Sequence, residues 1–214
     1  MKFSFNASGA NAPLIREYAI ASGTAVKVGE ALGMADSLAV AAADGDFLLG
    51  VCAEDHPGTH DEFNARADGT KIRVNIAPDA VYETALTQRA AISGSASTLV
   101  VDATGLSTNV NSGYVMLISK TETSANTDAV GAKRRISACA ISGSNATLTV
   151  ESAGTPSAGD VYLIVPDIGD ELYLDAAGTG VCFYSAASTV KLLTVYTDPA
   201  RGVLGVKFKA PLLA

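Results

Sequence analysis

The chain has 214 residues, of which 48% are hydrophobic, 17% charged and 6% aromatic, with no tryptophan. This balance excludes an intrinsically disordered chain, and the lack of a Gly-X-Y or heptad period excludes collagen-like and coiled-coil rods. The net charge is −7, from 15 Lys and Arg against 22 Asp and Glu, which disfavours a nucleic-acid-binding protein because such proteins need a basic face.

Residues 1–13 are polar and interrupted by Gly and Asn, so we expect a flexible N-terminal arm. The arm lacks the apolar core of a secretory signal. No window approaches the roughly 18 apolar residues that a membrane helix needs. We therefore expect a protein that is made in the cytoplasm and has no membrane partner.

The next part, residues 14–88, reads as short strands separated by glycine-containing turns. We expect these strands at 14–20, 24–28, 30–34, 37–41, 47–52 and 71–76. The last of them alternates, which predicts Ile72, Val74 and Ile76 on a buried face and Lys71, Arg73 and Asn75 on an exposed face. The best helical candidates are short, near residues 36–43 and 79–86.

The middle of the chain contains a repeat. Residues 91–101 (AISGSASTLVV) reappear as residues 140–150 (AISGSNATLTV), and a loop and an apolar strand follow each copy, at 114–118 and 161–165. Each copy predicts a strand, a tight Ser-Gly-Ser turn, a second strand, a loop and a third strand. We expect the two copies to pack on each other as a small sandwich, with residues 121–133 as an exposed loop.

The last part resumes the pattern of short strands, at 171–175, 181–184, 190–196 and 202–209. Turn signals recur every 8–12 residues or so, as in β-barrels and β-sandwiches. The fold class that we predict is therefore mainly β.

One polar segment, residues 52–62, contains both histidines of the chain. It could be a metal site formed by His56, His60 and a carboxylate, a catalytic pair of Cys52 and His56, or a solvated acidic loop. Pro57 and Gly58 break the helix that would aim both histidines at one ion. We favour the solvated loop.

Other signs of an enzyme or of a bound cofactor are missing from the sequence. Cys52, Cys139 and Cys182 are far apart and form no CxxC pair, so we expect buried thiols rather than a disulfide or zinc framework. No phosphate-binding loop, GxGxxG or GxSxG motif occurs. We therefore predict no enzymatic activity, with no catalytic residue, no metal and no cofactor.

Four short segments resemble a known family. They are residues 21–29 (ASGTAVKVG), 45–51 (GDFLLGV), 169–175 (GDELYLD) and 202–206 (GVLGV). These segments resemble the capsid decoration (cement) proteins of tailed bacteriophages, over residues 14–88 and 166–214. This chain differs in carrying the repeated segment 89–165 between the two halves.

The resemblance implies a small β-barrel formed by residues 14–88 and 166–214, with residues 89–165 inserted as a β-sandwich-like duplicated unit. It implies a structural virion protein on the outside of the capsid, which binds the phage major capsid protein as a homotrimer and staples neighbouring coat subunits. The expected capsid-contact residues are Lys2, Phe3, Phe5, Leu14, Ile15 and Arg16.

The alternative is a carbohydrate- or cell-surface-binding module displayed on the virion. In that hypothesis the inserted unit presents Tyr114, Tyr162 and the loop 121–133 to glycans. The absence of tryptophan weakens it, because sugar-binding surfaces usually stack on aromatic rings.

Overall fold

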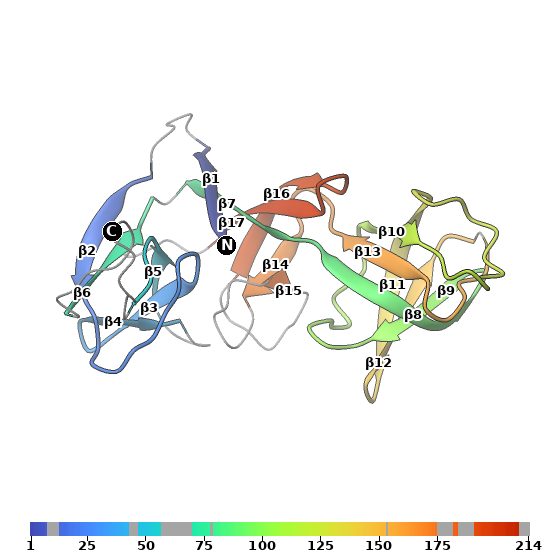
Figure 1. Cartoon of the computed structure of the whole chain (residues 1–214), viewed down its shortest axis with the longest axis horizontal. Coiled ribbons are helices and arrows are strands. Elements are labelled where there is room, and N and C mark those ends of the chain that lie inside the picture. The colour runs from blue at the N-terminus through green and yellow to red at the C-terminus, as the bar shows by residue number, and fades with distance from the viewer. Residues whose placement is uncertain are drawn as a thin grey trace.

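All regular structure in the described part of the chain is β-strand. The computed structural model describes residues 1–7, 13–42, 47–56, 70–77, 79–152, 154–174, 182–183 and 191–209. Figure 1 shows three groups of strands in a row: a five-stranded sheet at one end, a six-stranded sheet in the middle and a closed barrel at the other end. The predicted mainly-β class is confirmed.

The five-stranded sheet is antiparallel, with the strand order β2-β6-β5-β3-β4. Its strands are β2 (Ile15–Ala19), β3 (Ala31–Ala35), β4 (Leu38–Ala41), β5 (Phe47–Cys52) and β6 (Lys71–Asn75). The sheet curls until its two edge strands approach each other, where Ile20 bridges Ala39 and the Ala21 N–H donates to the Ala39 carbonyl at 3.1 Å. It thereby encloses a small core of its own, which includes Leu32, Leu49 and Ile72.

Two local predictions in this sheet are wrong. The short helical candidate near residues 36–43 is instead the hairpin of β3 and β4, which confirms the strand expected at 37–41; Asp36 and Ser37 both adopt positive φ, 49° and 66°, as a two-residue hairpin turn requires. The strand expected at residues 24–28 is reduced to a single bridge between Val26 and His56.

The central sheet combines the two ends of the chain, in the order β1-β7-β17-β16-β14-β15. Its strands are β1 (Lys2–Asn6), β7 (Ala80–Ala85), β14 (Glu171–Leu174), β15 (Cys182–Phe183), β16 (Lys191–Asp198) and β17 (Val203–Phe208). Strand β7 replaces the helix expected near residues 79–86. It pairs with β1 on one side and β17 on the other, which buries Val81 and Tyr82 completely and overrides a weak local helix preference.

The closed barrel lies in the inserted segment and not in the terminal parts, which corrects the predicted architecture. Its strands are β8 (Thr87–Ser95), β9 (Thr98–Asp102), β10 (Tyr114–Ser119), β11 (Lys133–Ser142), β12 (Asn145–Val150) and β13 (Val161–Val165). The strand order is β10-β11-β12-β9-β8-β13, and β13 pairs again with β10, so no edge is left open. The terminal parts instead form two open sheets: among the described residues, β1 and β15 remain edges of the central sheet, and the five-stranded sheet curls with only the Ile20–Ala39 bridge between its edges.

The barrel is built from the two copies of the repeat, which pair with each other about an approximate two-fold axis. Leu99 of the first copy pairs with Leu148, its counterpart in the second. Met116 likewise pairs with Leu163 in the strands that follow the two hairpins. The duplicated unit therefore closes on itself as one barrel, rather than packing as two layers of a sandwich.

The two copies differ at their hairpin turns. The second turns at Gly143 and Ser144, as predicted, and Gly143 has a φ of 57°. The first turns two residues later, after Ser95, and keeps Gly94 within β8. A Cβ on Gly94 would lie 2.8 Å from Cγ of Pro156, so this glycine serves a close approach and not a turn.

Residues 121–133 are mostly exposed, and residues 121–132 form the loop between β10 and β11, as expected, but the loop is also tied to the barrel. The carboxylate of Asp160, which is fully buried, accepts hydrogen bonds from the Ser124 hydroxyl at 2.9 Å and the Asn126 amide at 3.1 Å. Asp128 forms an ion pair with Arg134, which is also buried. Buried charges need such partners, so this network fixes the loop in place.

Replacing Asp160 by Asn should destabilise the protein most at neutral pH. Burial raises the pKa of Asp160, but hydrogen bonds from Ser157, Asn126 and Ser124 outweigh burial and hold it below its usual 3.8. A lowered pKa in the folded state contributes stability above about pH 4 that is lost as the pH falls further. Urea unfolding should therefore show a difference in stability between wild type and Asp160→Asn that shrinks below about pH 4. A difference that stays constant with pH would contradict this role.

Candidate functional site

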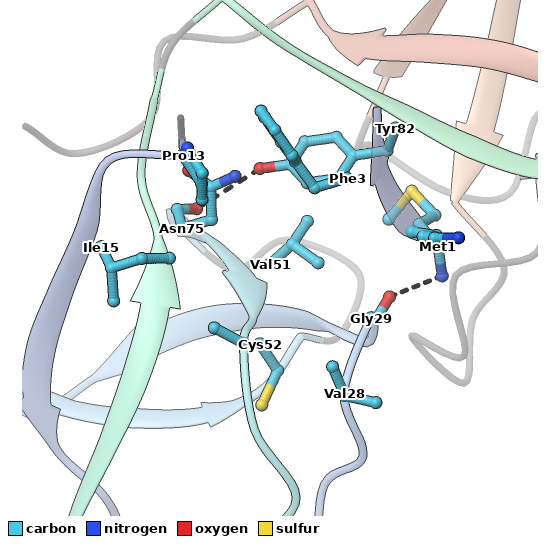
Figure 2. Close-up of a pocket in the computed structure, with 12 residues that line it drawn as sticks. Met1, Phe3, Pro13, Ile15, Val28, Gly29, Val51, Cys52, Asn75 and Tyr82 are labelled. Atoms are coloured by element: carbon cyan, nitrogen blue, oxygen red, sulfur yellow. Dashed lines mark hydrogen bonds between the residues drawn. The ribbon is translucent and has the colours of Figure 1, made fainter. Parts of the chain in front are cut away.

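An apolar pocket of about 420 Å³ lies where the start of the chain meets the five-stranded sheet. Figure 2 shows its walls, which include Phe3 of β1, Ile15 of β2, Val51 of β5 and Tyr82 of β7. Val28, in the segment before β3, completes the rim. Strands β1 and β7 of the central sheet and strands β2 and β5 of the five-stranded sheet thus contribute to one pocket at the junction of the two sheets.

One side of this pocket is polar. Asn75, at the end of β6, is only 3% exposed, although the alternation of its strand predicts an exposed side chain. Its side-chain oxygen accepts the Ala77 N–H at 3.1 Å, and its Nδ2, which is buried, has no hydrogen-bond partner among the described residues. The Tyr82 hydroxyl donates to the Asn75 backbone carbonyl at 3.5 Å (Figure 2).

Most of the side chains that line the pocket carry no charge at neutral pH. Burial raises the pKa of Tyr82, so its hydroxyl stays protonated at neutral pH. Burial also raises the pKa of Cys52, which lines the pocket, to about 12. Lys2 is the one side chain among the lining residues that is charged at neutral pH, and no carboxylate is among them.

Large apolar side chains are exposed around the pocket. Leu14, Ile15 and Val28 are 49%, 38% and 63% exposed. Leu14 immediately precedes β2 and Ile15 begins it, and β2 is an edge strand of its sheet. Exposed apolar residues near an edge strand are typical of a protein-docking surface.

The structure brings several of the expected capsid-contact residues to this surface. Lys2, Phe3 and Ile15 line the pocket itself. Arg16 is exposed on β2, next to Ile15. Signals available in the sequence did not point to the pocket, because its other walls come from strands far away in the chain.

The flexible arm expected over residues 1–13 is wrong for its first part. Residues 2–6 form the edge strand β1, in which Phe3 pairs with Tyr82 and Phe5 with Val81. The Phe3 ring also packs edge-on against Tyr82, with ring centroids 6.2 Å apart. This apolar contact holds the strand to the sheet, whereas the Phe5 side chain and residues 8–12 lie outside the described part.

The segment that contains both histidines offers no nucleophile in its described part. The Cys52 thiol donates to the Glu54 carbonyl at 2.6 Å, and its raised pKa keeps it a thiol at neutral pH. Nδ1 of His56 lies 3.3 Å from the Thr24 carbonyl oxygen. His60 lies outside the described residues. No group of three or more potential metal ligands occurs in the part of the chain that the structure describes.

The basic cluster of Lys133, Arg134 and Arg135 is not a basic surface. Arg134 is buried against Asp128, as described above, and Arg135 pairs with Asp167 at 2.8 Å. The Lys133 ammonium lies 5.0 Å from the centre of the Tyr114 ring. Two of the three charges are therefore neutralised within the chain, which leaves little to attract phosphates.

The tyrosines expected to bind glycans do not form a platform. Tyr162 is 1% exposed, with its hydroxyl accepting a hydrogen bond from the Asn126 amide at 2.8 Å. A different, polar pocket of about 230 Å³ lies where the barrel meets the central sheet. Its lining includes Asn109 and Asn111 from the barrel and Asp170 and Tyr173 from the central sheet.

Comparisons with protein-family models, with curated proteins and with solved structures give no match to this chain. Within the described residues, no helix is long and apolar enough to cross a membrane.

Cys52 should resist alkylation in the folded protein. At pH 8 the thiol is almost wholly protonated and buried, so iodoacetamide should modify it at least about tenfold more slowly than it modifies the unfolded chain. Peptide mass spectrometry separates Cys52 from the other two cysteines. Rapid native labelling of Cys52 would instead indicate an accessible, activated thiol.

Proposed function

We propose that this protein is a structural capsid decoration protein. It would bind the outside of a phage head as a homotrimer and staple neighbouring major capsid subunits. The observation that carries the proposal is the exposed apolar surface at the β2 edge, formed by Leu14, Ile15 and Val28 beside an open pocket. Exposed apolar surface of this kind is more typical of a stable protein–protein interface than of a surface that stays in contact with water.

The arrangement of the three groups of strands supports the same function. The β2 edge lies at one end of the molecule and the barrel at the other (Figure 1). A chain that docked through β2 would hold its barrel away from the docked surface. The part of β2 that lies away from the Ile20–Ala39 bridge can also accept a strand from a partner, with backbone hydrogen bonds that require no particular partner sequence.

The polar chemistry of the chain is compatible with a role in binding rather than catalysis. Within the described residues, the buried charged groups are engaged in structural pairs, such as Glu54 with Arg73 at 2.8 Å. The net charge of −7 keeps closely packed copies soluble. Trimers that make several modest contacts at once gain affinity through avidity. The proposal assigns no catalytic residue, metal or cofactor.

A second candidate function is carbohydrate binding, through the polar pocket at the junction of barrel and central sheet. Asn109, Asn111 and Asp170 supply amide and carboxylate groups, and Tyr173 supplies an aromatic ring. These are groups that recognise sugar hydroxyls and sugar rings. This pocket replaces the Tyr114 and Tyr162 surface as the place to test the alternative.

The capsid proposal predicts that the protein cosediments with phage heads that lack their decoration protein, and that it sediments as a trimer alone. Leu14→Glu together with Arg16→Glu should lower the amount bound at least about tenfold, because charge is placed on the docking surface. Val130→Glu together with Lys133→Glu is the matched control, since it changes the net charge by the same amount at exposed side chains of the barrel and its β10–β11 loop, far from β2. A monomer that does not bind heads, or equal binding by all three proteins, would refute the proposal.

The carbohydrate candidate predicts binding on a glycan array that Tyr173→Ala abolishes. Tyr114→Ala is the control, because Tyr114 lies outside the polar pocket. An array without hits, or hits that survive Tyr173→Ala, would remove this candidate.

A further inference from the structure

The two halves of the barrel are intertwined. The first half comprises β8, β9 and β10 (residues 87–119), and the second comprises β11, β12 and β13 (residues 133–165). Of the six strand pairings around the ring, only the hairpins β8–β9 and β11–β12 join strands of the same half. Strand β10 lies between β11 and β13, and β13 lies between β8 and β10. The third strand of each half therefore pairs with strands of the other half alone.

The strand registers between the halves are two-fold symmetric. Where β9 meets β12, Leu99 faces Leu148, its counterpart in the repeat. The flanking pairs turn into each other when the two copies of the repeat are exchanged: Thr98 with Thr149, and Val100 with Thr147. The pairing of β10 with β13 has the same symmetry about Met116 and Leu163. Such a surface is self-complementary, as in the two-fold interface between two copies of one chain.

Two arginines extend this symmetry to the polar contacts of the barrel. Arg89 lies in β8 opposite β13, and Arg134 lies in β11 opposite β10. Each guanidinium donates a hydrogen bond to a backbone carbonyl in the loop after the hairpin of its own half, Arg89 to Thr104 and Arg134 to Gly154. The two halves are thus equivalent partners both in their backbone pairing and in these side-chain contacts.

We infer that the barrel exchanges its halves between two copies of this chain, so that the first half of one copy closes with the second half of the other. Both barrels of such a dimer contain every strand pairing of the single-chain barrel, including Leu99 against Leu148. They also bury the same apolar side chains. Exchange is a low-cost route to a dimer, because only the connection between the exchanged parts takes a new path.

The connection, residues 120–132, determines when the halves exchange. It spans about 40 Å when extended, which is enough to link two neighbouring barrels. In the closed barrel it is held to the second half by hydrogen bonds, from Ser124 to Asp160 at 2.9 Å and from the Ala125 N–H to Ser157 at 3.0 Å. Exchange requires these bonds to break, so it takes place while chains refold. The link gives two halves of one chain an effective concentration of about 1 mM, so exchange increases with protein concentration.

The test is a disulfide between two variants of the whole protein, Thr98→Cys and Thr149→Cys, which are unfolded in urea, mixed and refolded together. These residues face each other where β9 meets β12, at a separation that a disulfide spans. Neither variant contains both thiols, so a disulfide between positions 98 and 149 forms only after exchange. Its yield should rise about tenfold for about a tenfold rise in protein concentration, because the share of a weak dimer is proportional to concentration. Peptide mass spectrometry distinguishes this disulfide from those of the native cysteines.

The matched control combines Thr149→Cys with Ala138→Cys. Ala138 also faces Thr149, but both belong to the second half, so exchange never brings them together from different chains. Ala138 and Thr149 are exposed and Thr98 is half-buried, so all three variants should fold. Absence of the disulfide between positions 98 and 149 at every concentration, or an equal yield in the control, would overturn the inference. The capsid proposal is tested separately, because the barrel and β2 lie at opposite ends of the molecule (Figure 1).

Discussion

Strand β7 is the element on which the arrangement of the whole molecule depends. It follows β6 of the five-stranded sheet after a short connection and leads, through Leu86, into β8 of the barrel. Its two edges are hydrogen-bonded to β1 and to β17, so it joins the beginning and the end of the described chain. The fully buried Tyr82 ring contacts Phe3 on one side and Phe208 on the other, which gives this pairing an apolar centre.

The sequence predicted the mainly-β class and most strands correctly, because alternation and glycine turns are local signals. It did not predict which strands close into a barrel, since closure depends on which edges meet. The repeat contained a hint: equal sequences that pair symmetrically, as at Leu99 and Leu148, leave matching edges that can close a ring. The expected terminal barrel was wrong because the terminal strands divide between two sheets.

The candidate site was less predictable than the fold. Alternation along β6 places Ile72 and Val74 inside correctly, but it places Asn75 outside. Asn75 is buried because the chain leaves the five-stranded sheet there and Tyr82 of the central sheet covers it. A residue at a junction between two sheets has no periodic signature, so only the tertiary structure identifies it. The expected contact residues Lys2, Phe3 and Ile15 meet at the pocket for the same reason, although they come from different strands.

The first and last strands of the barrel are neighbours, with Thr87 of β8 opposite Ile164 of β13. The chain therefore leaves and re-enters the central sheet at almost the same place. An inserted domain whose two ends are adjacent can be replaced by another domain without distorting the rest of the protein, as circular permutation and domain insertion show in general. The rest of the molecule could thus serve as a mounting platform, on which a foreign enzyme or antigen with closely spaced termini replaces the barrel.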